Sequence, residues 1–285
     1  MCLVIVIAFN DFLTAKKTLK KMYLYCMNFR FHKYQGTGND FIMIDDRSNH
    51  FPQDDIDYIA HCCNRRFGIG ADGLILIQNH HSADFKMVYF NADGRESTLC
   101  GNGARCTVAF AASLGIIEKE TTFIAIDGRH TASIEKDHTV ALRMHDVSDF
   151  RCEKDHTFLD TGSPHHVTMV TDLLQFAVVE KGREIRNCAP YFEEGSNVNF
   201  VEKVNDNTFA IRTYERGVED ETLSCGTGAT AVALAMHKTG VTASQSLNIL
   251  VEGGQLTVSF QAGDSAYTNI DLQGPATFVF EGEIA

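Results

Sequence analysis

The string CGNGA at residues 100–104 returns as CGTGA at residues 225–229, an offset of 125 positions. Other segments repeat at nearly the same offset: Gly115 with Gly240, IAIDG at 124–128 with ILVEG at 249–253, and TGN at 37–39 with TGS at 161–163. An offset shared by several separate segments indicates an internal repeat. We therefore predict two copies of one α/β (α+β-like) unit, arranged as two pseudo-symmetric domains.

Each copy places its cysteine at the start of a helix. A strand of alternating residues (86–90 and 209–214) leads into a polar loop, which leads to an alanine-rich helix (102–114 and 227–239). Gly115 and Gly240 follow these helices and stop them. We predict further strands at 122–126, 139–144, 247–251 and 256–260, a short linker within 146–158, and a last strand at 276–280. The domains are then 27–147 and 148–273, with 274–285 packing back on the first.

Composition narrows the function. The 285 residues have a net charge of −12, which disfavours nucleic acid or an anionic membrane as a partner. Nine cysteines, an odd number without C-x-x-C pairs, fit neither a disulfide framework nor a zinc ribbon and indicate a reducing, cytoplasmic location. Residues 1–26 begin with an apolar run too short to span a bilayer, and we interpret them as an extension outside the catalytic fold. The alternatives are a short strand or a segment that binds weakly to a membrane surface.

Two cysteines at two helix starts suggest proton chemistry. Unpaired N–H groups and the helix dipole are expected to lower the thiol pKa of Cys100 and Cys225 toward neutrality. If the copies face each other across a cleft, the N–H groups at 101–102 and 226–227 converge into a site for a carboxylate. Its α-carbon then lies between two sulfurs, one on each face. This is the arrangement that stereoinversion by an acid and a base requires.

Other candidate groups have simpler interpretations. Cysteines absent from the repeat are expected to be structural: Cys62, Cys63, Cys106, Cys152 and Cys188. The pairs His80-His81 and His165-His166 do not predict a metal site, because adjacent side chains on a strand point in different directions. His165 follows the repeated Thr-Gly-x loop, so it is either a structural histidine or one that contacts a carboxylate or a thiol.

Eight strings occur in an order that closely resembles the diaminopimelate epimerase family over residues 28–285. They are GTGNDF (36–41), GIGADG (68–73), FNADG (90–94), CGNGARC (100–106), GSPH (162–165), SNVNF (196–200), YERG (214–217) and ETLSCGTGA (221–229). The resemblance implies two similar domains with the active site in the cleft between them. It also implies a cofactor-independent, metal-free enzyme that interconverts LL- and meso-diaminopimelate for lysine and peptidoglycan synthesis, and a homodimer.

The resemblance assigns roles to individual residues. Cys225 is the proton acceptor for the LL substrate and Cys100 the proton donor, and His165 and Glu215 adjust the thiol pKa values. The substrate-binding positions are Asn39, Asn91, Gly101, Asn102, Ser163, Asn197, Glu215, Arg216, Gly226 and Thr227. Arg216 suits the second carboxylate of the substrate, because a guanidinium binds carboxylates through two parallel hydrogen bonds. Its alternative is a surface ion pair with Glu215 or Glu219.

Three positions depart from the family pattern, and several other functions stay open. Gly73 and Ser163 replace the side-chain amides found in some other members, and the second copy has one extra residue around 219–220.

A proline or hydroxyproline racemase also uses two cysteines, but it needs no cation to bind the far end of its substrate. A phenazine-type isomerase uses a carboxylate instead, and a thiol hydrolase needs a single cysteine. A redox or binding protein would join Cys100 and Cys225 in a disulfide.

Overall fold

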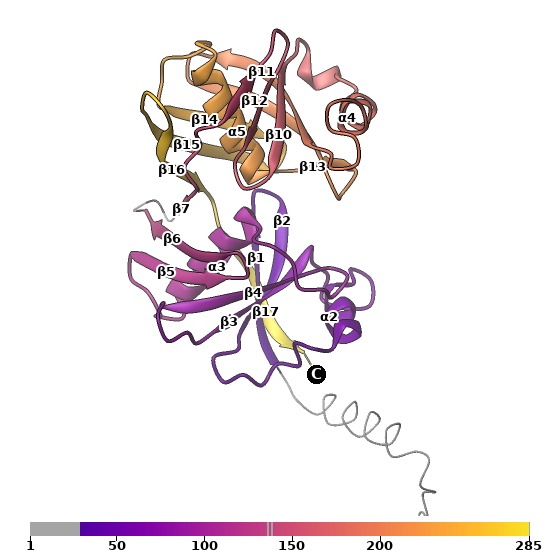
Figure 1. Cartoon of the computed structure of the whole chain (residues 1–285). Coiled ribbons are helices and arrows are strands. Elements are labelled where there is room, and N and C mark those ends of the chain that lie inside the picture. Colours follow the sequence, from indigo (N-terminus) through magenta and orange to yellow (C-terminus); the bar gives the residue numbers. More distant parts are fainter. Residues whose placement is uncertain (1–28, 136, 138, 285) are drawn as a thin grey trace, which may run out of the picture.

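The computed structural model describes residues 29–135, 137 and 139–284. The predicted extension at residues 1–26 lies outside the described residues. Two halves lie one above the other, each with a helix enclosed by strands (Figure 1). The strands pair into one continuous sheet in which β7 and β16 join the halves in antiparallel register, for example Leu142 opposite Leu272.

The first half pairs its strands in the order β17-β1-β2-β3-β4-β5-β6-β7. Only β2/β3 and β4/β5 are parallel. The predicted last strand is present as β17 and pairs with β1. The strands are β1 (Phe29–Gly36), β2 (Asn39–Asp45), β3 (Gly73–Gln78), β4 (Phe85–Asn91), β5 (Glu120–Ala125), β6 (Gly128–Ile134), β7 (Val140–Arg143) and β17 (Thr277–Ile284).

The second half follows the order β8-β9-β10-β11-β12-β14-β15-β16, again with two parallel pairs, β10/β11 and β12/β14. Order and direction therefore match between the halves, as the repeat predicts. The strands are β8 (Phe150–Cys152), β9 (Thr157–Asp160), β10 (Pro164–Met169), β11 (Asn197–Asn205), β12 (Thr208–Glu215), β13 (Asp220–Thr222), β14 (Ser246–Val251), β15 (Gly254–Ala262) and β16 (Tyr267–Gly274), with β13 on the side of β12.

The enclosed helices are α3 (Gly101–Ser113) and α5 (Gly226–Lys238). Both are rich in small and apolar residues and are buried on nearly every side, which suits a helix wrapped by a sheet. Gly115 and Gly240 follow them with φ of +70° and +74°, the left-handed conformation that ends a helix. Two outer helices, α2 (Ile56–Cys63) and α4 (Val178–Asn187), and the 3-10 turn η1 (Leu173–Gln175) cover the outer faces (Figure 1).

The structure adds detail to one sequence-based expectation and contradicts another. Part of the segment 146–158, where a short linker is predicted, belongs to a hairpin of β8 and β9 that extends to Asp160. Cys152 and Cys188 are exposed, so they do not serve as packed core residues, whereas Cys62, Cys63 and Cys106 are buried. All seven cysteines among the described residues are free.

Candidate functional site

The two helix starts meet where the halves join. Cys100 and Cys225 occupy the N-cap positions of α3 and α5 in extended conformations, and neither side chain caps its helix. The first residues of the two helices are neighbours: a β-carbon added to Gly226 would lie 4.0 Å from the Gly101 Cα atom and 3.8 Å from the Asn102 Oδ1 atom. The free N–H groups of both helices therefore gather in one region, as the sequence predicts.

A hydrogen-bond network joins the halves at this point. The Thr37 hydroxyl donates to the Ser224 hydroxyl at 2.8 Å, and Asn102 Nδ2 donates to the Ser224 carbonyl at 3.1 Å. Asn102 Nδ2 also donates to Asn39 Oδ1 at 2.6 Å, so two predicted binding residues contact each other directly. Arg105 Nη2 donates to Thr37 Oγ1 and to Asn102 Oδ1, at 3.1 Å and 2.9 Å. The orientation of Asn102 is therefore determined by partners on both halves.

The Glu215 carboxylate acts on both cysteines through its charge, but it forms a hydrogen bond only with Cys225. The Cys225 thiol donates to the Glu215 carboxylate and lies 3.5 Å from Thr227 Oγ1. The Thr222 hydroxyl donates to Glu215 Oε1 at 2.5 Å, which holds the carboxylate in place. Burial raises the pKa of Glu215, so this carboxyl accepts a proton more readily than an exposed one. Glu215 therefore lies beside the thiol of Cys225.

The thiol pKa values differ from the sequence-based expectation. Burial raises the pKa of Cys100, although the N–H groups of Asn102 and Gly103 lower it as a helix start should. Burial also raises the pKa of Cys225, and the nearby Glu215 charge raises it further. The expectation that the thiol pKa values lie near neutrality is therefore wrong, since the effect of burial outweighs that of the helix dipole. Both thiols are protonated at neutral pH.

A second group of predicted residues lies beside a cavity of about 510 Å³. Asn197 Nδ2 donates to Ser163 Oγ at 2.7 Å, and Asn197 Oδ1 accepts from the Arg216 main-chain N–H at 2.9 Å. Ser163 and Arg216 both line the cavity. Arg216 donates to the Glu194 carbonyl at 2.9 Å and forms no ion pair with a described carboxylate, whereas Glu219 pairs with Arg186. The guanidinium charge of Arg216 is therefore available to an anion.

The two predicted site residues His165 and Asn91 differ in burial. His165 is fully buried, with Nδ1 3.1 Å from Asn199 Nδ2. Burial, and then the Arg216 charge, lower its pKa to about 3, so it is neutral at physiological pH. Asn91 ends β4 and is exposed.

The departures from the family pattern have structural explanations. A β-carbon at Gly73 would lie 2.5 Å from the Phe90 carbonyl oxygen and 2.5 Å from Tyr89 Cε2, so a side chain there has no room. Near the extra residue, Glu219 has a φ of +61°. Its carboxylate accepts from the Gly217 N–H at 3.0 Å, which anchors the longer loop.

Several side chains at the site belong to the conserved-looking strings, but the sequence alone assigns them no binding or catalytic role. Asp72 of GIGADG accepts from Asn39 Nδ2 at 3.0 Å, and Arg105 of CGNGARC is fully buried. Asn199 of SNVNF contacts His165. Their presence in these strings was the only sequence signal that they belong to the site, because residue spacing does not reveal hydrogen-bond partners on other strands.

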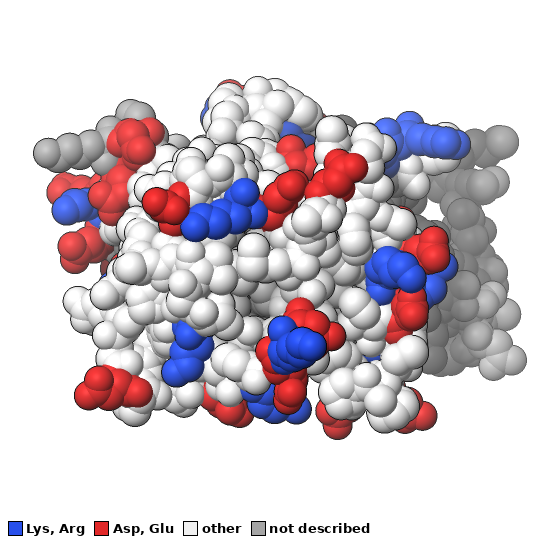
Figure 2. All heavy atoms as spheres, turned by 90° about the horizontal axis from the view of Figure 1, so that it is seen from above, with Lys and Arg blue, Asp and Glu red and all other residues white. Residues whose placement is uncertain are grey.

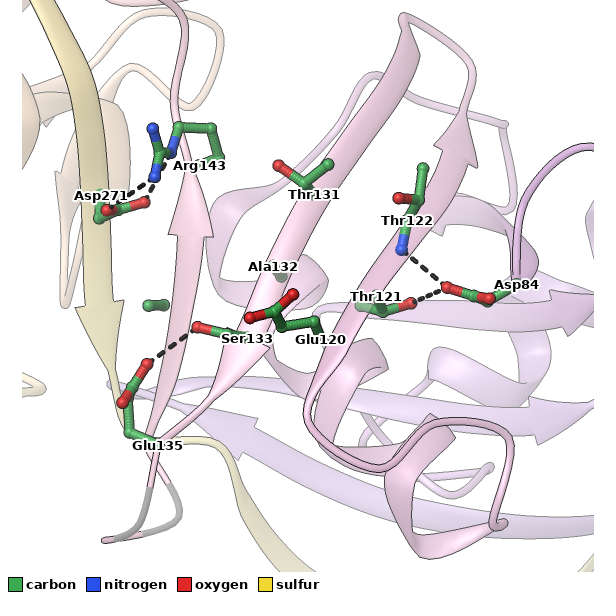
Figure 3. Close-up of a pocket in the computed structure, with 11 residues that line it drawn as sticks. Asp84, Glu120, Thr121, Thr122, Thr131, Ala132, Ser133, Glu135, Arg143 and Asp271 are labelled. Atoms are coloured by element: carbon green, nitrogen blue, oxygen red, sulfur yellow. Dashed lines mark hydrogen bonds and ion pairs between the residues drawn. The ribbon is translucent and has the colours of Figure 1, made fainter.

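The other features of the surface and interior do not resemble this site. A polar groove of about 460 Å³ lies over β5, β6, β7 and β16, where Arg143 pairs with Asp271 (Figure 3); none of the predicted residues lines it. On the face seen in Figure 2, basic side chains lie beside acidic ones and form no continuous basic area. Within the described part of the chain, no cluster of three or more His, Cys, Asp or Glu could hold a metal, and no helix is long and apolar enough to cross a membrane.

Comparison with known sequences gives a consistent result. A family model described as diaminopimelate epimerase matches residues 31–148 and 157–279. The chain is 56% identical over 255 residues to a diaminopimelate epimerase of Flavobacterium psychrophilum, covering 90% of this chain and 100% of the relative. It is 42% identical over 261 residues to the enzyme of that name from Chlorobaculum tepidum, covering 87% and 98%.

Solved structures with low sequence identity share the fold. A phenazine biosynthesis protein of the PhzF family from Bacillus anthracis superposes with a TM-score of 0.70 at 15% identity, covering 91% of this chain and 99% of that one. A hydroxyproline epimerase from Agrobacterium vitis, with bound trans-4-hydroxy-L-proline, gives a TM-score of 0.62 at 14% identity, covering 92% and 93%.

Proposed function

The chain belongs to the diaminopimelate epimerase family of amino-acid isomerases, and from this membership we propose that it interconverts LL- and meso-diaminopimelate by a two-base transfer between Cys225 and Cys100. The observation that carries the proposal is that two helix starts, each with a cysteine at the N-cap position, meet at the junction of the halves. We place the reaction in the cytoplasm, in lysine and peptidoglycan synthesis, with no cofactor.

The reacting carboxylate binds at the two helix starts. The N–H groups at 101–102 and 226–227 donate to its oxygens, and the positive ends of both dipoles favour the anion. As the α-proton leaves, negative charge spreads onto these same oxygens, so the donors bind the transition state more strongly than the ground state. No metal is required for this stabilisation.

Glu215 prepares the base. Cys225 already donates to this carboxylate, whose raised pKa suits it to take the thiol proton. The Cys225 thiolate then removes the α-proton, and the bonding electrons remain on the substrate as an enolate. The Cys100 thiol donates its proton to the opposite face. Cys225 ends as a thiol, Cys100 as a thiolate and Glu215 as a neutral carboxylic acid. Loss of the Glu215 proton to solvent and uptake of one proton by Cys100 restore the starting state.

The non-reacting end of diaminopimelate binds at the cavity beside Arg216. The guanidinium, which has no carboxylate partner among the described residues, pairs with the distal carboxylate. Asn197 fixes the Arg216 backbone and Ser163 relative to each other. A proline-type substrate has no group to occupy this position, so Arg216 favours diaminopimelate.

The activity is tested by incubating the reduced protein with LL-diaminopimelate and following the meso isomer by chiral chromatography. We expect conversion of LL-diaminopimelate and none of L-proline. Arg216→Met should raise KM about 10- to 100-fold, as expected when a charged hydrogen bond worth about 1.5–3 kcal/mol is lost. Turnover of proline but not of diaminopimelate would refute the assignment.

We also propose that the chain forms a homodimer through β17. This strand pairs with β1 and with no other described strand, so its second edge is free. Phe278, Val279 and Phe280 are consecutive and each is about half exposed. A free edge with exposed apolar side chains favours pairing with a second copy.

A further inference from the structure

The two copies differ behind the first turn of their helices. In the first copy, a β-carbon on Gly103 would face the apolar side chains of Ile75 and Phe41. At the equivalent Gly228 it would lie 2.5 Å from Asn199 Oδ1 and 3.3 Å from Cys225 Sγ. Asn199 is fully buried. Because burying an amide is costly where an apolar residue would fit, the polar residue behind Cys225 calls for a specific explanation.

The hydrogen bonds of Asn199 determine how its amide is oriented. Nδ2 lies 3.1 Å from the His166 carbonyl oxygen, which can only accept, so the NH₂ group must face that side. Oδ1, on the other side, accepts from the Thr213 hydroxyl at 3.0 Å. Both ends of the amide therefore have partners that agree on one orientation.

This orientation determines the position of the proton on His165. Asn199 Nδ2 also lies 3.1 Å from His165 Nδ1, and since the amide nitrogen only donates, Nδ1 must accept. A neutral imidazole that accepts at Nδ1 carries its proton on Nε2. Nε2 is buried and has no partner among the described residues, so it is a free donor.

The location of His165 suggests what this donor binds. His165 on β10 pairs in register with Asn197 on β11, and the Arg216 charge is close enough to lower the pKa of the His165 ring. An unsatisfied buried donor costs about 1–3 kcal/mol, which an anionic oxygen of a ligand would recover.

We propose that Asn199 is a positioning residue that holds His165 as the neutral Nε2–H tautomer, so that Nε2–H donates to a carboxylate oxygen of the bound substrate. The identity of that substrate rests on the proposed function, whereas the tautomer does not. His165 then acts as a hydrogen-bond donor and not as a proton-transfer base, since its only unprotonated nitrogen is occupied by Asn199.

The tautomer can be measured directly. Protein labelled with ¹⁵N at histidine is examined by long-range ¹H–¹⁵N correlation near neutral pH, and the His165 signals are assigned by their loss in His165→Gln. We expect Nε2 protonated and Nδ1 unprotonated. Nδ1–H or an imidazolium at His165 would overturn the proposal, whatever the activity of the enzyme.

Variants test the role of Asn199. In Asn199→Asp the carboxylate accepts from Nδ1, so the His165 proton should move to that nitrogen. In Asn199→Ser the restraint is lost, so both tautomers should be present. The kcat for diaminopimelate should fall by about 10- to 100-fold in each variant, a typical loss when a residue that orients a functional imidazole is removed. Thr107→Val is the control, because it removes a buried hydrogen bond of 2.8 Å to the Gly103 carbonyl without touching His165.

The outcomes separate the two proposals. A changed tautomer with reduced kcat in either Asn199 variant, and kcat within about twofold of wild type in Thr107→Val, supports the inference. An unchanged Nε2–H tautomer and unchanged kcat in a folded Asn199 variant overturns it. If the wild-type protein shows the Nε2–H tautomer but does not epimerise diaminopimelate, the proposed function fails while the tautomer assignment stands.

Discussion

Replacing Thr37 by valine tests the junction at which the helix starts meet. Valine matches threonine in shape but lacks the hydroxyl, which is buried and has three polar neighbours. It donates to Ser224 at 2.8 Å, with Asn102 Oδ1 as a more distant acceptor at 3.4 Å, and it accepts from Arg105 at 3.1 Å. The repeat supplies a matched control, Thr161→Val. The Thr161 hydroxyl is equally buried but donates only to the Thr227 carbonyl, at 2.9 Å.

The expected magnitudes follow from these partners. A neutral hydrogen bond contributes about 0.5–1.5 kcal/mol net, and one to a charged group about 1.5–3 kcal/mol. Thr37→Val loses one of each, so the free energy of unfolding should fall by about 2–4 kcal/mol. The loss is not recovered elsewhere, because Arg105 is fully buried and its Nη1 already lacks a partner among the described residues. Thr161→Val loses one neutral bond and should cost about 1 kcal/mol.

Urea unfolding followed by circular dichroism measures both variants. The double variant Thr37→Val/Ser224→Ala should cost less than the two single changes together, because both remove the same bond. Thr37→Val should also lower kcat, since Arg105 and Asn102 then lose their common partner. Equal losses of stability in Thr37→Val and Thr161→Val would refute the reasoning.

Three further outcomes follow from single sites. Burial raises the folded-state pKa of Glu215 above its ordinary 4.5, so ionising this carboxyl costs stability as pH rises through that window. Glu215→Gln should therefore have a higher free energy of unfolding than wild type at pH 8, and this difference should vanish below pH 4.5. The variant should also lose epimerase activity. A difference that stays constant from pH 4 to 8, measured by urea unfolding, would contradict this reasoning. Gly73→Ala should lower the free energy of unfolding by about 1–3 kcal/mol, because the added carbon clashes with the Phe90 carbonyl oxygen. An unchanged urea midpoint would contradict this, because it would mean that the strand shifts to accommodate the methyl group without cost. Val279→Lys should halve the mass measured by analytical ultracentrifugation, whereas a wild-type protein that is already monomeric would rule out the proposed dimer.

The repeat made the fold predictable. Because Cys100 and Cys225 stand at equivalent positions, the sequence predicted both helices and some of the strands around them, namely β4, β5, β7, β12, β14 and β15. The hairpin of β8 and β9 was not predicted, because its counterpart in the first half is the pair β17 and β1, whose two strands come from opposite ends of the described chain. The return of the last strand to the first half was predicted from its position beyond the second copy, and the structure shows that its partner is β1.

Of the site residues, only those that lie in recognisable motifs could be predicted from the sequence. Residues that follow the repeat, such as Asn102 and Thr227, lie at the helix starts as expected. The thiol pKa directions were not predictable, because burial depends on how the halves close over Cys100 and Cys225. The role of Asn199 was hidden for a related reason: its counterpart in the sheet register of the first half, Ile75, is apolar, and only the folded chain shows that a polar side chain lies behind Gly228 where apolar ones lie behind Gly103.

The central claim is that the proton is removed by one cysteine and returned by the other. It is tested by allowing LL-diaminopimelate to react briefly in deuterium oxide and then analysing product and remaining substrate by mass spectrometry. The two-base mechanism predicts that the meso product carries solvent deuterium at the inverted carbon while the recovered LL substrate still carries protium. Deuterium in the recovered LL substrate at the rate of product formation, or product that retains the substrate proton, would contradict it.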